Sequence, residues 1–99
     1  MSESKSHKVA ANRIAKKLNA EYNSDKGVDI VTQRVAIEVE TPETISSGFQ
    51  QLRGHRKPVY IAGTNREAVE KALAATKNTT VGVMDSTGKI IKLSTRKKS

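Results

Sequence analysis

The chain has 99 residues, of which 35% are hydrophobic and 28% are charged, so it fits one domain with a small core. It contains no cysteine, which excludes disulfides, zinc–thiolate sites, iron–sulfur clusters and thiol nucleophiles. No apolar run approaches the roughly 20 residues that span a bilayer, and residues 1–8 lack a signal-peptide core, so we expect a soluble cytoplasmic protein.

The charge is strongly positive: 18 Lys and Arg residues against 10 Asp and Glu give +8 at pH 7. This balance predicts a polyanionic partner, first of all nucleic acid, although it could also serve solubility alone. The chain has one Phe, two Tyr and no Trp, which leaves little for stacking on bases. We therefore expect duplex or branched DNA, held by its backbone, rather than a single strand or RNA.

Both ends are rich in charge and poor in apolar residues, so residues 1–7 and 95–99 are predicted to be flexible tails around one domain of residues 8–94. Residues 8–22 predict a helix, because Ala10, Ile14, Leu18 and Tyr22 recur every four residues. Residues 28–32 and 34–40 predict two strands of a tight hairpin. The second strand alternates, with Ile37 and Val39 on one face and Glu38 and Glu40 on the other.

A second helix is expected after Thr41, a good N-cap, with Pro42 in the first position and Gly54 just past its end. Gly48 lies inside this helix, where glycine costs about 1 kcal/mol. That cost indicates close packing against a neighbouring element.

The remaining sequence predicts a buried strand over 57–62, a helix to residue 77, and strands over 81–84 and 89–93. Thr64 and Glu67 have the spacing of a capping box at the start of this helix, and residues 85–88 predict a hairpin turn. The resulting order, αββαβαββ, predicts an α/β (α+β) fold with a small mixed sheet flanked by helices.

Nucleophile triads and phosphate loops are absent from the sequence, which has no GxxxxGK[ST] and no GxGxxG motif. Neither histidine indicates a catalytic site. His7 falls in the predicted tail, and His55 is expected to extend a basic run rather than to act as a base.

The acidic residues are more informative, because a basic protein holds few of them. Glu38 and Glu40 share one face of a strand about 7 Å apart, and a hairpin would bring Asp29 near them. Carboxylate clusters of this kind suit Mg²⁺ or Mn²⁺. The alternative is a solvated strand face with two outward glutamates.

The run Gly27-Val28-Asp29-Ile30, followed by residues 36–40 (AIEVE), resembles the PD-(D/E)xK nuclease superfamily. This superfamily has the restriction endonuclease-like fold and includes the archaeal Holliday-junction resolvases. The resemblance covers residues 8–77 and implies that Asp29 and Glu38 bind a divalent metal, with the Val39 carbonyl as a further ligand. It also implies that Gln51, or Gln50, helps to arrange the site.

Two positions depart from the superfamily's usual motif. Val28 stands where many members have Pro, and Glu40 stands where most have the Lys of Glu-x-Lys. Some restriction endonucleases carry Glu-x-Glu, so the resemblance gives Glu40 the role of a general base or an extra metal ligand. A lysine could also come from elsewhere, for instance Lys26.

Basic residues predicted to contact DNA phosphates form three groups along the chain. These are Lys8, Arg13, Lys16 and Lys17; Arg53, His55, Arg56 and Lys57; and Lys89, Lys92, Arg96, Lys97 and Lys98. Such contacts give affinity rather than sequence readout.

We therefore expect a metal-dependent DNA endonuclease, and the resemblance to the junction resolvases implies a homodimer. One alternative is a catalytically inactive nucleic-acid-binding or assembly protein on the same fold. Another is a basic partner within a larger protein complex.

Overall fold

The computed structural model describes residues 5–23 and 28–97, which form three helices and a five-stranded sheet. The order of helices and strands along the chain is the predicted one. The elements are α1 (Lys5–Lys17), β1 (Ile30–Val31), β2 (Ala36–Glu40), the 3-10 turn η1 (Pro42–Thr44), α2 (Ile45–Gln51), β3 (Val59–Gly63), α3 (Arg66–Ala75), β4 (Gly82–Met84) and β5 (Ile90–Lys92).

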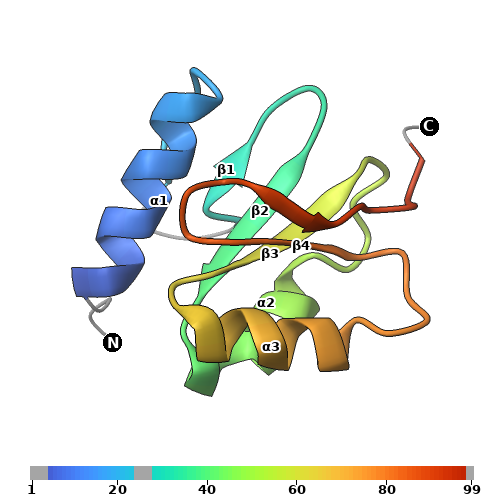
Figure 1. Ribbon diagram of the computed structural model, residues 1–99. Helices are drawn as coiled ribbons and strands as arrows, with labels where there is room; N and C mark the ends of the chain where they lie inside the picture. Colours follow the sequence, from blue (N-terminus) through green and yellow to red (C-terminus); the bar gives the residue numbers. More distant parts are fainter. Residues whose placement is uncertain (1–4, 24–27, 98–99) are drawn as a thin grey trace.

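The sheet is mixed, and its strands lie in chain order from β1 to β5. β1 pairs with β2 antiparallel, β2, β3 and β4 are parallel, and β5 pairs with β4 antiparallel. Helix α1 covers one face, while α2 and α3 cover the other (Figure 1). The α/β (α+β) class with a sheet between helices is thus confirmed.

Strand β2 is buried on both faces, as is its parallel neighbour β3. Ile37 and Val39 pack against Ala11 and Ile14 of α1, whereas Ala36 belongs to the core under α2 and α3. This division follows the alternation in the sequence, because successive strand residues point to opposite faces. The polar residues of the same strand, Glu38 and Glu40, are therefore carried into the interior.

Helix α1 is shifted towards the N-terminus from its predicted range of 8–22. It already includes Lys5 to His7, which were predicted to be tail, and it ends at Lys17. Asn19 adopts the left-handed conformation with φ of 53°, and the Ala20 amide donates to the Ala15 carbonyl at 2.8 Å. This Schellman ending uses Asn where Gly is more usual, which is why the sequence pattern runs past it.

The hairpin strands are shorter than predicted, and the loop between them is longer. Residues 32–35 form the turn, in which the Thr32 hydroxyl accepts from the amides of Arg34 and Val35 at 3.0 Å each. The short hydroxyl side chain offers the backbone a partner that a strand ladder would otherwise provide. The predicted tight hairpin is confirmed, because the Thr32 amide donates to the Val35 carbonyl at 2.8 Å and only Gln33 and Arg34 lie between them.

The ends of the other elements differ in detail from the predictions. Pro42 does follow the N-cap Thr41, but it opens a 3-10 turn before α2. The cap of α3 is Asn65, whose side chain accepts from the Ala68 amide, so the predicted capping box at Thr64 and Glu67 is wrong. The turn after β4 is confirmed, with the Asp85 carboxylate accepting from the backbone amides of Thr87 and Lys89.

The chain beyond β5 is held to the domain rather than being a free tail. The Thr95 amide donates to the Thr80 carbonyl, and the Arg96 guanidinium donates to the carbonyls of Leu52 and His55. Among the residues that the structure describes, no helix is long and apolar enough to cross a membrane.

Candidate metal centre

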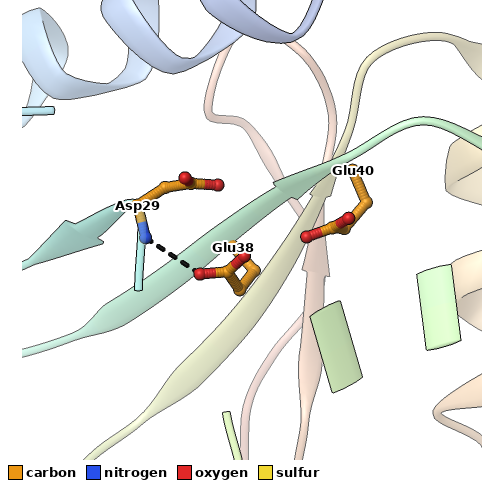
Figure 2. Close-up of side chains that lie close together, drawn as sticks. All are labelled: Asp29, Glu38 and Glu40. Atoms are coloured by element: carbon orange, nitrogen blue, oxygen red, sulfur yellow. Dashed lines mark hydrogen bonds between the residues drawn. The ribbon is translucent and has the colours of Figure 1, made fainter. Parts of the chain in front are cut away.

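Three carboxylates converge beside the first hairpin: Asp29, directly before β1, and Glu38 and Glu40 on β2. One oxygen from each lies within 4.8 Å of the others (Figure 2). All three residues are buried, with exposed fractions of 6%, 5% and 6%. The predicted cluster is therefore present, and the alternative of a solvated strand face is wrong.

Glu38 and Glu40 project from the face of β2 that α2 covers, because they alternate with Ile37 and Val39. Gly48 of α2 lies directly against Glu40: a Cβ on Gly48 would come within 2.5 Å of the Glu40 Cγ. The missing side chain leaves the space that the glutamate occupies. The predicted close packing at Gly48 is thus confirmed, and its neighbour is a residue of the site.

Asp29 is fixed by its main chain as well as by its side chain. Its amide donates to Glu38 Oε2 at 2.9 Å, and its carbonyl accepts from the Asn23 amide at 2.7 Å. The Val39 amide donates to Asp29 Oδ2 at 2.9 Å. In a strand both main-chain groups of a residue point to the same side, so the Val39 carbonyl also faces the side where Asp29 lies.

A fourth side chain, His7 of α1, reaches the cluster although the sequence placed it in a tail. Its Nε2 lies 3.1 Å from Asp29 Oδ2, and its Nδ1 lies 3.1 Å from the Tyr22 hydroxyl. The signal that could have found it is its position four residues before Ala11 and seven before Ile14. Those spacings place His7 on the inward face of the helix.

Burial dominates the electrostatics of the cluster. It raises the pKa of Glu38 to about 9, and the nearby charge of Asp29 adds to the effect. Burial also raises the pKa of Glu40, partly offset by hydrogen bonds from Thr44 and Glu38. At neutral pH Glu38 is therefore protonated and donates towards Glu40, so a proton serves as the counter-charge that a cation would supply.

Carboxylate oxygens at this spacing are the donor set that Mg²⁺ and Mn²⁺ prefer. The chemistry of the donors fits such an ion, because three buried acidic groups must otherwise be protonated or paired. The predicted helper residues are less clearly placed. Gln51 is exposed, and no hydrogen bond within the described part of the chain joins it to the carboxylates; Gln50 instead accepts from Arg53 at 3.3 Å.

The four residues of α1 that were predicted to contact DNA form a cationic surface. All four are exposed, and none makes an ion pair with a carboxylate of residues 5–23 or 28–97: Lys8, Arg13, Lys16 and Lys17. By contrast, the cations of α3 are paired with glutamates one turn away, Arg66 with Glu70 and Lys71 with Glu67. The charge of α1 is thus available to a partner.

The other predicted DNA contacts divide into exposed residues and residues whose side chains bind main-chain carbonyls. Arg53, Arg56 and Lys97 are exposed, and His55 is half-buried. Lys57 donates to the Thr32 carbonyl, Lys92 donates to the Thr76 and Val81 carbonyls, and Arg96 holds the end of α2. These three residues have a structural role that the sequence prediction missed. Lys98 and Lys26 lie outside the described residues.

No protein-family model matches the chain, and no curated protein or solved structure matches it either. The class of protein must therefore be inferred from the fold and from the carboxylate cluster.

Proposed function

We propose that the chain is a small metal-dependent DNA endonuclease of the PD-(D/E)xK type, acting on phosphodiesters of duplex or branched DNA. The observation that carries the proposal is the convergence of three buried carboxylates in a protein of net charge +8. Their sequence spacing and their place on a hairpin between two helices resemble the superfamily's site.

In this proposal Asp29, Glu38 and Glu40 hold Mg²⁺ or Mn²⁺, with the Val39 carbonyl as a further ligand. When bound, the ion supplies Lewis-acid charge at the phosphate. The chain's own residues supply the rest. The Asp29 and Val39 amides orient two of the carboxylates through hydrogen bonds of 2.9 Å, and α2 covers Glu40.

Glu40 stands where the superfamily usually has Lys, and this position decides how the reaction could run. A carboxylate there can accept a proton from an attacking water, which a charged lysine cannot do. The raised pKa of Glu40 brings its proton-accepting range closer to neutral pH. We therefore assign Glu40 the role of general base or third ligand.

DNA would lie against the exposed cations of α1, whose N-terminal end carries His7 into the carboxylate cluster. This helix thus connects the phosphate-binding surface with the site. A homodimer, as in the junction resolvases, would provide two such surfaces.

A second candidate is a nucleic-acid-binding or assembly protein that keeps the fold without catalysis. The observation that favours it is the absence of a motif lysine at position 40. In that case the protonation of Glu38 would only reduce the negative charge of an acidic cluster that no longer takes part in catalysis.

A titration with Mg²⁺ or Mn²⁺, followed through backbone NMR signals, separates the two candidates. The endonuclease predicts localised changes at Asp29, Glu38 and Val39, and their loss in Glu38→Gln. Glu70→Gln, which neutralises an exposed carboxylate of α3, is the matched control and should respond like the wild type. No localised change in the wild type would favour the binding protein.

A further inference from the structure

We propose that His7, supported by Tyr22, is a positioning residue that holds the Asp29 carboxylate in its metal-binding orientation; this inference rests on the proposed function. The contacts that carry it are the 3.1 Å approach of His7 Nε2 to Asp29 Oδ2 and the 3.1 Å approach of His7 Nδ1 to the Tyr22 hydroxyl. They join the helix, the segment after it and the residue before β1.

The two oxygens of Asp29 are used differently. Oδ2 accepts from the Val39 amide and faces His7 Nε2. An ionised carboxylate oxygen can only accept hydrogen bonds. The imidazole nitrogen that faces Oδ2 must therefore carry a proton and donate the hydrogen bond. No hydrogen bond within the described part of the chain reaches Oδ1, so this oxygen is the one presented to an ion.

Glu38 is also fixed through one oxygen, because its Oε2 accepts from the Asp29 amide. Each of the two carboxylates is thus held through one oxygen by a main-chain amide. Hydrogen bonds of this kind fix the orientation of carboxylate ligands and raise metal affinity.

His7 acts through Asp29 rather than as a ligand of the same ion. The group of described acidic and histidine side chains whose ligand atoms all lie within 4.8 Å contains Asp29, Glu38 and Glu40, but not His7. Ligand atoms at about 2.1–2.3 Å from one ion cannot be further apart than that. The imidazole therefore belongs to the shell behind the carboxylate.

Burial of the His7 and Asp29 side chains strengthens the hydrogen bond between them. The His7 and Asp29 side chains are 12% and 8% exposed, and the rings of His7 and Tyr22 pack with centroids 5.9 Å apart. Water therefore competes weakly for the hydrogen bond, and the ring has little freedom to turn.

The test measures Mn²⁺ affinity by electron paramagnetic resonance in wild type, His7→Leu, His7→Gln and Tyr22→Phe. We expect His7→Leu to weaken Mn²⁺ binding about 10- to 100-fold, the usual loss for a partner behind a ligand. His7→Gln, which keeps an N–H donor at the position of Nε2, should recover most of the affinity. Tyr22→Phe should lose a few-fold, and His55→Leu is the matched histidine control.

A second measurement needs no metal: hydrogen exchange of the Val39 amide, which donates to the same Asp29 oxygen. It should become faster in His7→Leu than in wild type and be restored in His7→Gln. Wild-type Mn²⁺ affinity in His7→Leu, or failure of His7→Gln to recover it, would overturn the inference. If the wild type itself binds no Mn²⁺, the proposed function fails, and unchanged Val39 exchange in His7→Leu would then overturn the positioning role separately.

Discussion

Glu38 carries the largest electrostatic cost in the described part of the molecule, because its carboxyl is buried beside two others. Its pKa rises from 4.5 to about 9, so between these values the folded protein binds a proton that the unfolded chain has released. Stability therefore falls as the pH rises through this window, since the folded state binds more protons than the unfolded state.

We predict that metal-free wild-type protein loses thermal stability between pH 5 and pH 9, and that Glu38→Gln shows a shallower dependence. At pH 8 the variant should be more stable by about 1–2 kcal/mol, because a neutral amide needs no proton on folding, whereas Glu38 must take up a proton that the unfolded chain has released. Thermal unfolding in a chelator at several pH values measures this. A wild-type stability that rises across the window would contradict the assignment.

Glu40 is the residue at which the proposed chemistry departs from the superfamily's usual motif. If it is a base or ligand, Glu40→Gln should lower any cleavage at least 100-fold, the usual contribution of a general base. If it only replaces a lost lysine, Glu40→Lys should instead raise activity. Single-turnover cleavage rates of both variants, beside wild type, distinguish the two roles.

At the residue scale, the three acidic residues of the site could be predicted from the sequence, but the histidine that contacts them could not. Asp29, Glu38 and Glu40 could be found because strand alternation and a short hairpin are local patterns. His7 could not be assigned, because its partner is 22 residues away and the helix start was placed after it.

At the scale of helices and strands, their order along the chain could be predicted from the sequence, but the residues at which they begin and end could not. The hydrophobic periods of α1 and β2 come from core burial, which the sequence pattern records directly. The ends depend on single backbone conformations and side-chain caps, such as Asn19 at positive φ and Asn65 at the start of α3. These caps compete with several neighbouring residues of similar chemistry, so the sequence alone leaves their positions open.

Helix α2 is predicted to depend on Gly48 for the shape of the site. In Gly48→Ala the new Cβ would meet the Glu40 Cγ at 2.5 Å, so the glutamate must rotate away. We expect a net loss of about 1–2 kcal/mol, since overpacking outweighs the gain in helix propensity, together with weaker Mn²⁺ binding. Ser47→Ala, at an exposed position of the same helix, is the control and should leave both unchanged.

For the whole molecule, the distribution of charge favours a backbone-binding mode. Lys8, Arg13, Lys16 and Lys17 of α1 are exposed and make no ion pair with a carboxylate of the described residues, whereas Arg66 and Lys71 of α3 are paired with glutamates, so the surface is asymmetric. If about six phosphates are neutralised, the logarithm of affinity for duplex DNA should fall with the logarithm of salt with a slope near −5.

Replacing Lys16 and Lys17 by Gln should reduce that slope by about 2, since each phosphate contact contributes about 1. Lys71→Gln removes a cation that is paired with Glu67 on α3 and should leave the slope unchanged. Fluorescence anisotropy with a labelled duplex at several salt concentrations gives these values. A flat salt response of the wild type would remove DNA as the partner.

The central claim is that the buried carboxylates make this basic protein a metal-dependent nuclease. The most direct measurement is cleavage of linear, nicked, flapped and four-way DNA in Mg²⁺ or Mn²⁺ by wild type and by Glu38→Ala. We predict that the wild type cleaves at least one form. Glu38→Ala should cleave none while binding DNA at least as tightly, because the change removes a metal ligand that serves the transition state and leaves the cations of α1 in place. Wild-type protein that is inert on every form, or Glu38→Ala that cleaves as well as wild type, would contradict the claim.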